Sequence, residues 1–206
     1  MNILGIDEAG RGPVIGPLIV AGIVIPEEKV VILNRMGIKD SKKLTPRRRK
    51  VLSRKLESMF EFETVEITAK DIDSLRAKGV NLNEIEKIAM IKIIKKLKWD
   101  KIIIDSVDIK PKRLEEGIKK VVSDAKIVSE HKADEKYLQV AAASIVAKSK
   151  RDQIIEKIKK EYREIGDVGS GYPSDPKTKE FLKKFSYSEM PDIVRKSWNT
   201  VQKLKK

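Results

Sequence analysis

The chain has 206 residues, of which 40% are hydrophobic and 37% charged, and its formal net charge is +14. This length fits one large domain, or one domain with a small appendage. No apolar run is long enough to cross a bilayer, no signal peptide is expected, and the lack of cysteine excludes disulfides and thiolate metal sites. We expect a cytoplasmic protein with a polyanionic partner, first of all nucleic acid, although ribosomal and membrane-surface proteins share this charge.

The N-terminal stretch, ILGIDEAGRGP at residues 3–13, begins as a short buried strand and places two carboxylates, Asp7 and Glu8, where that strand should end. Gly10-Arg11-Gly12 follows, and its glycines let a ligand approach the backbone beside a cation. This combination suits a divalent metal and a phosphate. Because neighbouring strand residues point to opposite faces, the two acids can share a metal only if the pleat breaks between or just after them, a break that Ala9-Gly10 allows. A solvated acidic turn is the alternative.

Two further strands are expected in the first third of the chain. Residues 14–26 are apolar and β-branched, which predicts a strand paired with the first through the Gly-rich turn. Residues 27–37 form a connection with about one helical turn. Residues 60–68 alternate apolar and polar side chains, which is typical of a half-exposed antiparallel strand.

A helix is expected between these strands. Thr45 is a good N-cap and Pro46 suits the first helical position, so the helix should run to about Met59. The preceding Asp-Ser-Lys-Lys, residues 40–43, would lie at the positive end of the helix dipole and could bind phosphate. A solvated basic loop is the alternative.

The middle of the chain predicts two helices and then a buried strand. The helices are a short one at 71–79 and a longer one capped by Asn83 and ending near Leu97, with a core-forming stripe of Ile85, Ile88, Ala89, Ile91 and Ile94. Residues 101–106 contain three consecutive isoleucines, typical of a strand buried on both faces. Asp105 ends this strand, where ligand sites collect in open α/β sheets, and burial demands a cation or a hydrogen-bond network for it. Asp108, in the following loop, ranks lower.

The next segments lead to a second candidate acid. A helix is expected from Pro111 to about residue 122 and a short strand at 125–129, followed by a long helix through the small-residue run AAAS to Lys160. Asp134 precedes that helix and is either a first-turn or capping acid, or a ligand that faces Asp105. His131 is a surface or structural histidine or a base, and it stays unassigned.

The last part of the chain begins with a loop at 166–176, GDVGSGYPSDP, which carries one aromatic residue. Tyr172 could stack on a nucleotide, or it could pack on the helix beneath the loop. A short helix at 177–185, a Met-Pro break at 190–191 and a basic tail helix with Trp198 should follow.

Taken together, these motifs resemble the type 2 ribonuclease H family (RNase HII) in its archaeal form. The matching stretches are GIDEAGRGPVIGP at 5–17, DSKKL at 40–44, IIIDS at 102–106, HKADEKYLQVAAASIVAKSKRD at 131–152 and GSGYPSD at 169–175. The resemblance implies an α/β, ribonuclease H-like fold with a five-stranded mixed sheet flanked by helices. It also implies a catalytic domain at 1–165 followed by a substrate-contacting loop and a C-terminal helical extension at 166–206.

The resemblance also implies the site. Asp7, Glu8, Asp105 and Asp134 would be catalytic and would hold Mg²⁺ or Mn²⁺. Gly10, Arg11 and Gly12 would lie along the ribose-containing strand and sense its 2′-hydroxyl, Lys42 would touch phosphate, and Tyr172 would stack on the sugar of the following deoxynucleotide. A set of carboxylates without cysteine is hard oxygen ligation, in keeping with these metals.

The function implied is an endonuclease that cuts 5′ of a ribonucleotide in RNA–DNA hybrids and in DNA with embedded ribonucleotides. Two metal ions about 4 Å apart would leave a 5′-phosphate and a 3′-hydroxyl. A monomer is expected, and a sliding-clamp contact is left open. The rival hypotheses are a DNA-cleaving metal nuclease of the same fold, with no need for the Gly-Arg-Gly turn, and a non-enzymatic basic RNA-binding protein, which leaves a buried Asp105 unexplained. The many Lys, Glu and Ile residues also resemble a thermophile's composition.

Overall fold

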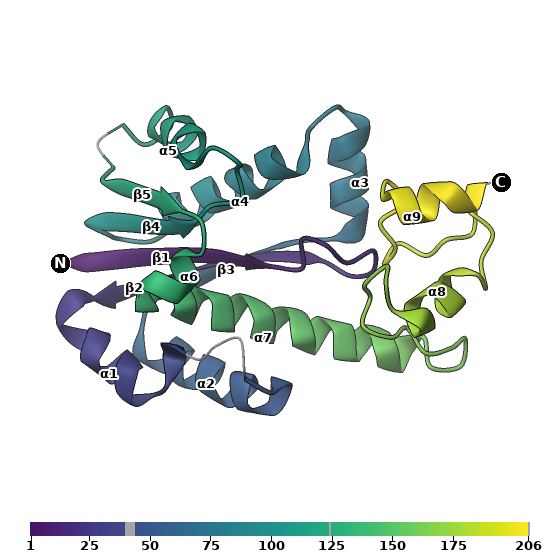
Figure 1. Cartoon of the computed structure of the whole chain (residues 1–206), viewed down its shortest axis with the longest axis horizontal. Coiled ribbons are helices and arrows are strands. Elements are labelled where there is room, and N and C mark those ends of the chain that lie inside the picture. Colours follow the sequence, from purple (N-terminus) through teal and green to yellow (C-terminus); the bar gives the residue numbers. More distant parts are fainter. Residues whose placement is uncertain (40–43, 124, 206) are drawn as a thin grey trace. The chain divides into compact units, whose positions relative to one another are not determined.

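A five-stranded mixed sheet is the central feature of the computed structural model, which describes residues 1–39, 44–123 and 125–205 (Figure 1). The strands are β1 (Asn2–Ala9), β2 (Leu18–Pro26), β3 (Phe62–Ile67), β4 (Lys101–Asp105) and β5 (Ile127–Glu130). They lie in the order β3-β2-β1-β4-β5, with β1 antiparallel to β2 and parallel to β4, and β4 parallel to β5. The prediction of a five-stranded mixed sheet is confirmed.

Helices make up most of the remaining described chain. They are η1 (Glu27–Lys29), α1 (Val30–Arg35), α2 (Pro46–Met59), α3 (Ala69–Ala77), α4 (Leu82–Lys96), α5 (Pro111–Lys119), α6 (Ala133–Lys136), α7 (Leu138–Glu161), α8 (Pro176–Leu182), α9 (Asn199–Gln202) and η3 (Lys203–Lys205). The start of α2 is as predicted, because the Thr45 hydroxyl accepts a hydrogen bond from the Arg48 N–H at 3.3 Å and Pro46 occupies the first turn.

The chain forms two compact units, each assembled from segments far apart in the sequence. The first comprises Met1–Ala9, Ile19–Val65 and Asn83–Ser149, and the second comprises Gly10–Leu18, Glu66–Leu82 and Lys150–Lys206. The second unit takes in all of the predicted extension at 166–206 together with earlier segments. The domain boundary at residue 165 stays a prediction.

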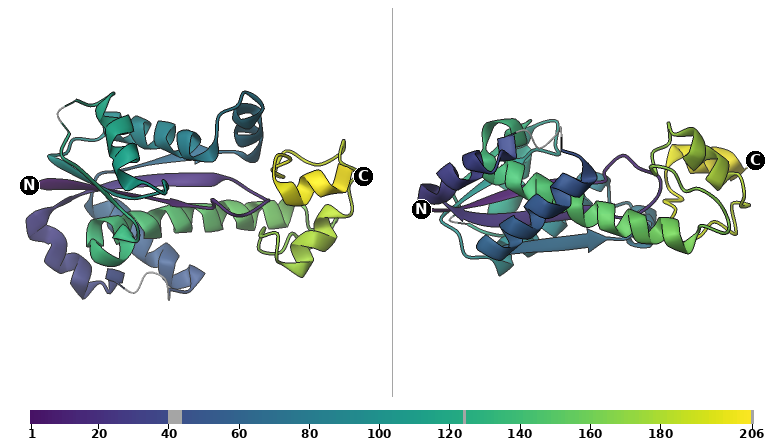
Figure 2. Two further views of the ribbon diagram at one scale, coloured as in Figure 1. Left: turned by 45° about the horizontal axis from the view of Figure 1, so that its top comes forward. Right: turned by 90° about the horizontal axis from the view of Figure 1, so that it is seen from below.

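Two strand glycines let helices lie close to the sheet in the first unit. A Cβ added to Gly5 in β1 would be 2.3 Å from the backbone carbonyl carbon of Gln139 in α7, and one added to Gly22 in β2 would be 2.4 Å from Ile93 in α4. The β1–β2 register places the two glycines on opposite faces, because side chains alternate along each strand. Helix α4 and the first half of α7 therefore cover opposite faces of the sheet (Figure 1 and Figure 2).

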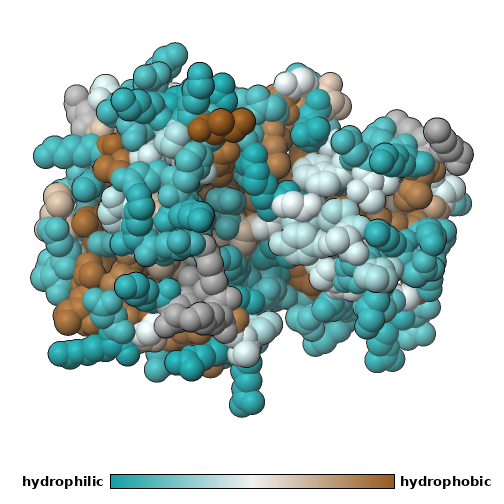
Figure 3. Space-filling view, in the orientation of Figure 1, coloured by the Kyte–Doolittle hydropathy of each residue, from teal (hydrophilic) through white to brown (hydrophobic). Residues whose placement is uncertain are grey.

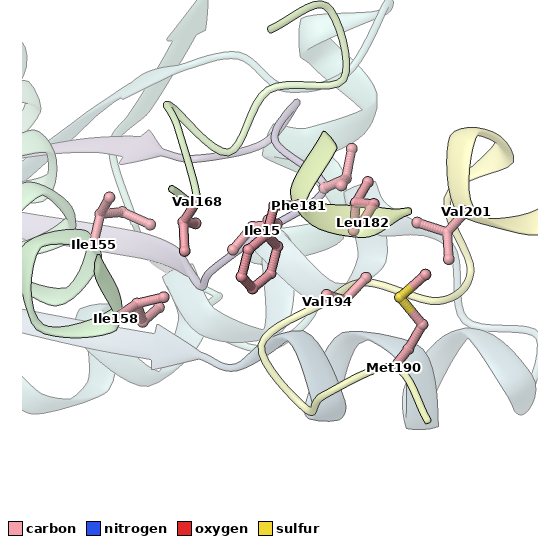
Figure 4. Close-up of a cluster of buried hydrophobic side chains, with 10 residues drawn as sticks. Ile15, Ile155, Ile158, Val168, Phe181, Leu182, Met190, Val194 and Val201 are labelled. Atoms are coloured by element: carbon pink, nitrogen blue, oxygen red, sulfur yellow. The ribbon is translucent and has the colours of Figure 1, made fainter. Parts of the chain in front are cut away.

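The second unit has its own apolar core, drawn in Figure 4. Ile15 from the segment after β1, Phe181 from α8 and Val194 from the chain before α9 are all at most 1% exposed in it. Phe181 also makes edge-to-face contacts with the rings of Tyr162 and Phe185, at centroid distances of 5.7 and 5.3 Å. This core joins the C-terminal segment to residues 14–15, which stand just after the Gly-Arg-Gly turn.

Several predicted boundaries were wrong, and the N-terminal ones matter for the site. Strand β1 does not end at the acids but continues to Ala9, paired with β2 along its whole length. Strand β2 begins at Leu18 and not at residue 14, because Gly16 has φ +85° and residues 14–15 turn to donate their N–H groups to the Gly171 carbonyl. Contacts with distant segments, which local sequence patterns do not reveal, decide where β1 ends and where β2 begins.

Two helix predictions also need correction. Helix α4 begins at Leu82, so Asn83 lies in its first turn and does not precede it as a cap. Its Ile88 is 44% exposed, whereas Met90 and Ile93 are buried, so the core stripe is rotated from the predicted one. The long helix, α7, begins at Leu138 as predicted, and the residues that lead into it form the separate short helix α6, which ends before extended Tyr137.

Hydrophilic side chains dominate the face shown in Figure 3, in keeping with a chain that is 37% charged. Within the described ranges, none of the helices combines the length and the apolar character needed to span a membrane.

Candidate active site

Three carboxylates from separate elements converge in the first unit. Asp7 is in β1, Asp105 ends β4 and Asp134 is in α6, and one oxygen from each lies within 4.8 Å of the others. The parallel β1–β4 register ends at Ile6–Ile104, so Asp7 and Asp105 follow at the same level and on the same face. The end of strand pairing therefore brings two acids together, and α6 supplies the third.

The turn before α6 places Asp134. Lys132 precedes the helix with φ +57° and ψ +36°, the one described non-glycine residue with positive φ, a conformation that costs free energy for a side chain of this kind. The next N–H, that of Ala133, donates to Asp105 Oδ1 at 3.0 Å. This hydrogen bond ties the start of α6 to the end of β4, so that Asp134 and Asp105 lie together.

Asp7 is nearly fully buried, with 4% of its surface exposed. Burial raises the pKa of its carboxyl group well above the usual range, and the negative charges of Glu8 and Asp105 raise it further. A hydrogen bond from the Ser144 hydroxyl and the positive charge of Lys148 act in the opposite direction. Lys148 Nζ donates to Ser144 Oγ at 2.7 Å, so this pair on α7 partly offsets the concentration of negative charge.

Glu8 is not part of this three-acid group. It follows Asp7 on a strand that stays paired with β2 as far as Ala9, so the pleat is regular between the two acids and their side chains point to opposite faces. Its negative charge still contributes to the raised pKa of the Asp7 carboxyl group. A role for Glu8 as a metal ligand stays a prediction.

The donor set fits a hard divalent cation. Three carboxylate oxygens within 4.8 Å repel one another unless a cation or protons neutralise them, and the chain has no cysteine that would favour a softer metal. Mg²⁺ and Mn²⁺ prefer such oxygen ligands. The cluster can therefore hold a divalent ion, while the identity of the ion is not determined by the ligands alone.

The Gly-Arg-Gly turn and Tyr172 meet in the second unit. Gly10 has φ +93°, which only glycine adopts readily, and a Cβ there would be 2.4 Å from Arg151. A Cβ on Gly12 would be 3.5 Å from the Tyr172 ring, and Tyr172 is 45% exposed. An aromatic ring and a glycine backbone thus lie next to each other at the surface of this unit.

The remaining predicted residues have other positions. Lys42 lies outside the described residues. Asp108 forms an ion pair with Arg113 at 2.7 Å, and that contact lowers the pKa of Asp108, which explains its burial without a ligand role. His131 lies 3.3 Å from the Ile109 carbonyl oxygen through its Nε2 atom, and its role stays open.

Comparison with known proteins decides the family. The sequence profile of Ribonuclease HII matches residues 4–201. Ribonuclease HII of Methanothermobacter thermautotrophicus is 60% identical over 205 residues, which cover 100% of both chains. The chain belongs to the ribonuclease HII family. It is accordingly a ribonuclease H, an endonuclease that hydrolyses its substrate, and its family depends on divalent metal ions.

Solved ribonuclease HII structures confirm the predicted fold. The ribonuclease H2 of Pyrococcus horikoshii superimposes with a TM-score of 0.91 at 43% identity, covering 100% of this chain and 97% of the other. A ribonuclease HII from Archaeoglobus fulgidus, solved as a complex with PCNA, gives a TM-score of 0.87 at 41% identity and covers 97% and 96% of the two chains. The α/β, ribonuclease H-like fold is therefore shown.

Several residues around these ribonuclease HII motifs escaped the sequence analysis. Ser144 and Lys148 were read only as part of a packing helix, and Arg195 was not singled out at all. The sequence could have indicated the first two as an interacting pair, because they stand four residues apart and so share one helix face. Arg195 follows no pattern, since its burial depends on residues about 180 positions earlier.

Proposed function

We propose that this ribonuclease HII hydrolyses the phosphodiester bond 5′ of a ribonucleotide, both in RNA–DNA hybrids and in DNA with embedded ribonucleotides, and leaves a 5′-phosphate and a 3′-hydroxyl. The observation that carries the proposal is the convergence of Asp7, Asp105 and Asp134 in a chain of this family. The net charge of +14 supports a nucleic-acid duplex as the substrate.

Metal binding in this proposal falls to the carboxylates. Asp7, Asp105 and Asp134 would share one ion, and Glu8, the neighbour of Asp7 in β1, would contribute to a second. Bound Mg²⁺ or Mn²⁺ would supply activation of the attacking water and neutralisation of charge on the scissile phosphate. The chain's own part is to hold Asp7 in place through Ser144, so that the acids need little rearrangement when the ions bind.

Recognition of the ribose is assigned to the second unit. The backbone of residues 10–12 would contact the ribose and its phosphate, and Tyr172 would stack on the next deoxyribose. The exposure of the Tyr172 ring beside Gly12 supports this assignment. Lys42 would add a phosphate contact. The PCNA complex of the Archaeoglobus relative supports adding a sliding-clamp contact to the proposal.

The proposal is tested with three labelled duplexes in Mg²⁺: all-DNA, DNA with one ribonucleotide, and an RNA–DNA hybrid. We expect cleavage of the second and third only, with the cut in the second on the 5′ side of the ribonucleotide. Cleavage of all three would indicate a general metal nuclease. Cleavage of none, in Mg²⁺ or Mn²⁺, would indicate a binding protein whose acids are structural.

Tyr172 variants extend the same assay. Replacing Tyr172 with Ala removes the exposed ring, and we expect cleavage at the single ribonucleotide to slow by about tenfold or more, the effect of one lost stacking contact. Tyr172→Phe keeps the ring and serves as the matched control. Equal slowing by both variants on every substrate would argue against stacking.

A further inference from the structure

Arg195 has a buried guanidinium group that lies outside the acid cluster and contacts the Gly-Arg-Gly turn. Arg195 is 0% exposed and is the largest of the fully buried side chains. An arginine is rarely buried completely unless its donors are satisfied. Here the three nitrogens of its guanidinium group donate to backbone carbonyls of one short segment, residues 10–16.

The acceptors include two carbonyls of the Gly-Arg-Gly turn itself. Arg195 Nη2 donates to the Gly10 oxygen at 2.6 Å and Nη1 to the Arg11 oxygen at 3.0 Å. Its Nε donates to the Gly16 oxygen at 3.0 Å, on the far side of the turn. The backbone N–H of Arg195 donates to the Val14 oxygen at 2.8 Å, which fixes the origin of the side chain.

Trp198 binds the third carbonyl of the turn, that of Gly12. Its indole Nε1 donates to the Gly12 oxygen at 3.3 Å, and the Arg195 guanidinium lies over its ring at 4.8 Å. Asp73 of α3 holds the intervening chain, because its carboxylate accepts from the N–H groups of Lys196 and Ser197 at 2.7 and 3.0 Å. All three carbonyls of the turn therefore point toward one anchored pair of side chains.

Because the carbonyls of the turn are held on one side, the directions of its N–H groups are fixed as well. The described peptide bonds include no cis bond, and in a planar trans peptide the N–H points opposite to the C=O. The Gly10 carbonyl belongs to the same peptide as the Arg11 N–H, and the Arg11 carbonyl to the same peptide as the Gly12 N–H. Both N–H groups are therefore directed away from Arg195, and their carbonyls are polarised by a full positive charge.

We propose that Arg195, assisted by Trp198, is a positioning residue that holds the peptide planes of residues 10–12 so that the N–H groups of Arg11 and Gly12 face the ribose-phosphate backbone. Selectivity for a ribonucleotide then depends on a side chain that does not touch the substrate. This inference rests on the proposed function, because that function assigns the ribose contact to residues 10–12.

The test measures selectivity, which a merely structural role would not change. In Mg²⁺, the KM for a duplex with one ribonucleotide is compared with the inhibition constant of the same duplex made entirely of DNA. Arg195→Lys keeps the charge but loses the fork that reaches three carbonyls. We expect the ratio of inhibition constant to KM to fall by up to about tenfold, the effect of losing one hydrogen bond to the 2′-hydroxyl, which the all-DNA duplex lacks.

A pair of tryptophan variants keeps the test decisive if Arg195→Lys does not fold. Trp198→Phe keeps a ring over Arg195 but loses the donor to Gly12, and it should lower the same ratio. Trp99→Phe is the matched control, because the Trp99 indole also donates to a backbone carbonyl, that of Ile94 at 2.8 Å. A wild-type ratio in the folded Arg195 or Trp198 variants, or an equal fall in Trp99→Phe, would overturn the inference. Wild-type protein that cuts no ribonucleotide-containing duplex would instead refute the proposed function.

Discussion

At the scale of single residues, the acid cluster has an electrostatic cost to the stability of the fold. Asp7 is buried beside other carboxylates and carries a raised pKa, which means that its charge is unfavourable in the metal-free fold. The Ser144 hydroxyl and the Lys148 ammonium reduce that cost. A bound divalent cation would neutralise this unfavourable charge, which supports the proposed metal site.

Asp7→Asn should therefore separate activity from stability. We expect Mg²⁺-dependent cleavage to fall more than about hundredfold, since even residues that only support metal ligands cost 10–100-fold when lost. The metal-free melting temperature should rise because a buried like charge is removed, and duplex binding should persist or strengthen. Cleavage assays and thermal melts with and without Mg²⁺ measure both effects; near-normal turnover would contradict the metal role.

Asp175 should make stability depend on pH through the loop that carries Tyr172. Its oxygens accept hydrogen bonds from the N–H groups of Ser170 and Lys177, at 2.6 and 2.9 Å, and the Ser170 contacts lead in lowering its pKa to about 2. Because the folded pKa lies below the unfolded value of 3.8, this stabilisation is present above about pH 4 and is lost as pH falls toward 2.

Asp175→Asn should lower the melting temperature at neutral pH by about 2–4 °C. The difference from wild type should shrink to near zero as the pH approaches 2. The comparison of melting temperatures over this range checks the prediction, and a difference that does not vary with pH would show that the charge is not responsible. Glu164→Gln, at an 89% exposed side chain, is the control.

At the scale of elements, the close approach of β1 and α7 determines the geometry of the site. Strand β1 carries Asp7 and α7 carries Ser144, and Gly5 lets them meet, because its virtual Cβ is 2.3 Å from the Gln139 backbone. Backbone cannot move aside as the end of a flexible side chain can. A methyl group at Gly5 must therefore push the helix away from the strand.

Gly5→Ala should destabilise the protein by about 1–3 kcal/mol, the usual cost of overpacking, and should also slow cleavage because Ser144 shifts relative to Asp7. Gly117→Ala is the matched control. Gly117 lies in α5, and its added methyl meets only the flexible side chain of Lys87 in α4, at 3.1 Å, so the higher helix propensity of Ala should leave stability unchanged or improved. Denaturant titrations of both variants, with cleavage rates, measure the contrast; equal losses would refute the close-packing argument.

At the scale of the whole molecule, the charge of +14 should control duplex binding. Each phosphate neutralised by Lys or Arg releases counterions, so affinity should fall about tenfold between 50 and 200 mM salt for every two phosphates contacted. Fluorescence anisotropy with all-DNA and ribonucleotide-containing duplexes checks this. Both should show the same slope, because ribose recognition through backbone N–H groups adds no phosphate neutralisation by a cation; an affinity insensitive to salt would contradict a duplex-binding surface.

The sequence by itself determined most of what is local in this protein. Thr45 and Pro46 set the start of α2, the isoleucine run set β4, and the joint occurrence of five short motifs carried the resemblance to the family. These features depend on neighbouring residues, whose steric and hydrogen-bonding preferences are visible in a short window.

Tertiary structure alone decided how distant segments complete the two units. It carried β1 past Asp7 because β2 pairs with it to Ala9, and it left Glu8 out of the three-acid group for the same reason. It also buried Arg195 against the carbonyls of residues 10–16, which lie 179 to 185 positions earlier. Side-chain direction and burial at such positions are set by which segments pack together, and that depends on the free energy of the whole fold and not on any local pattern.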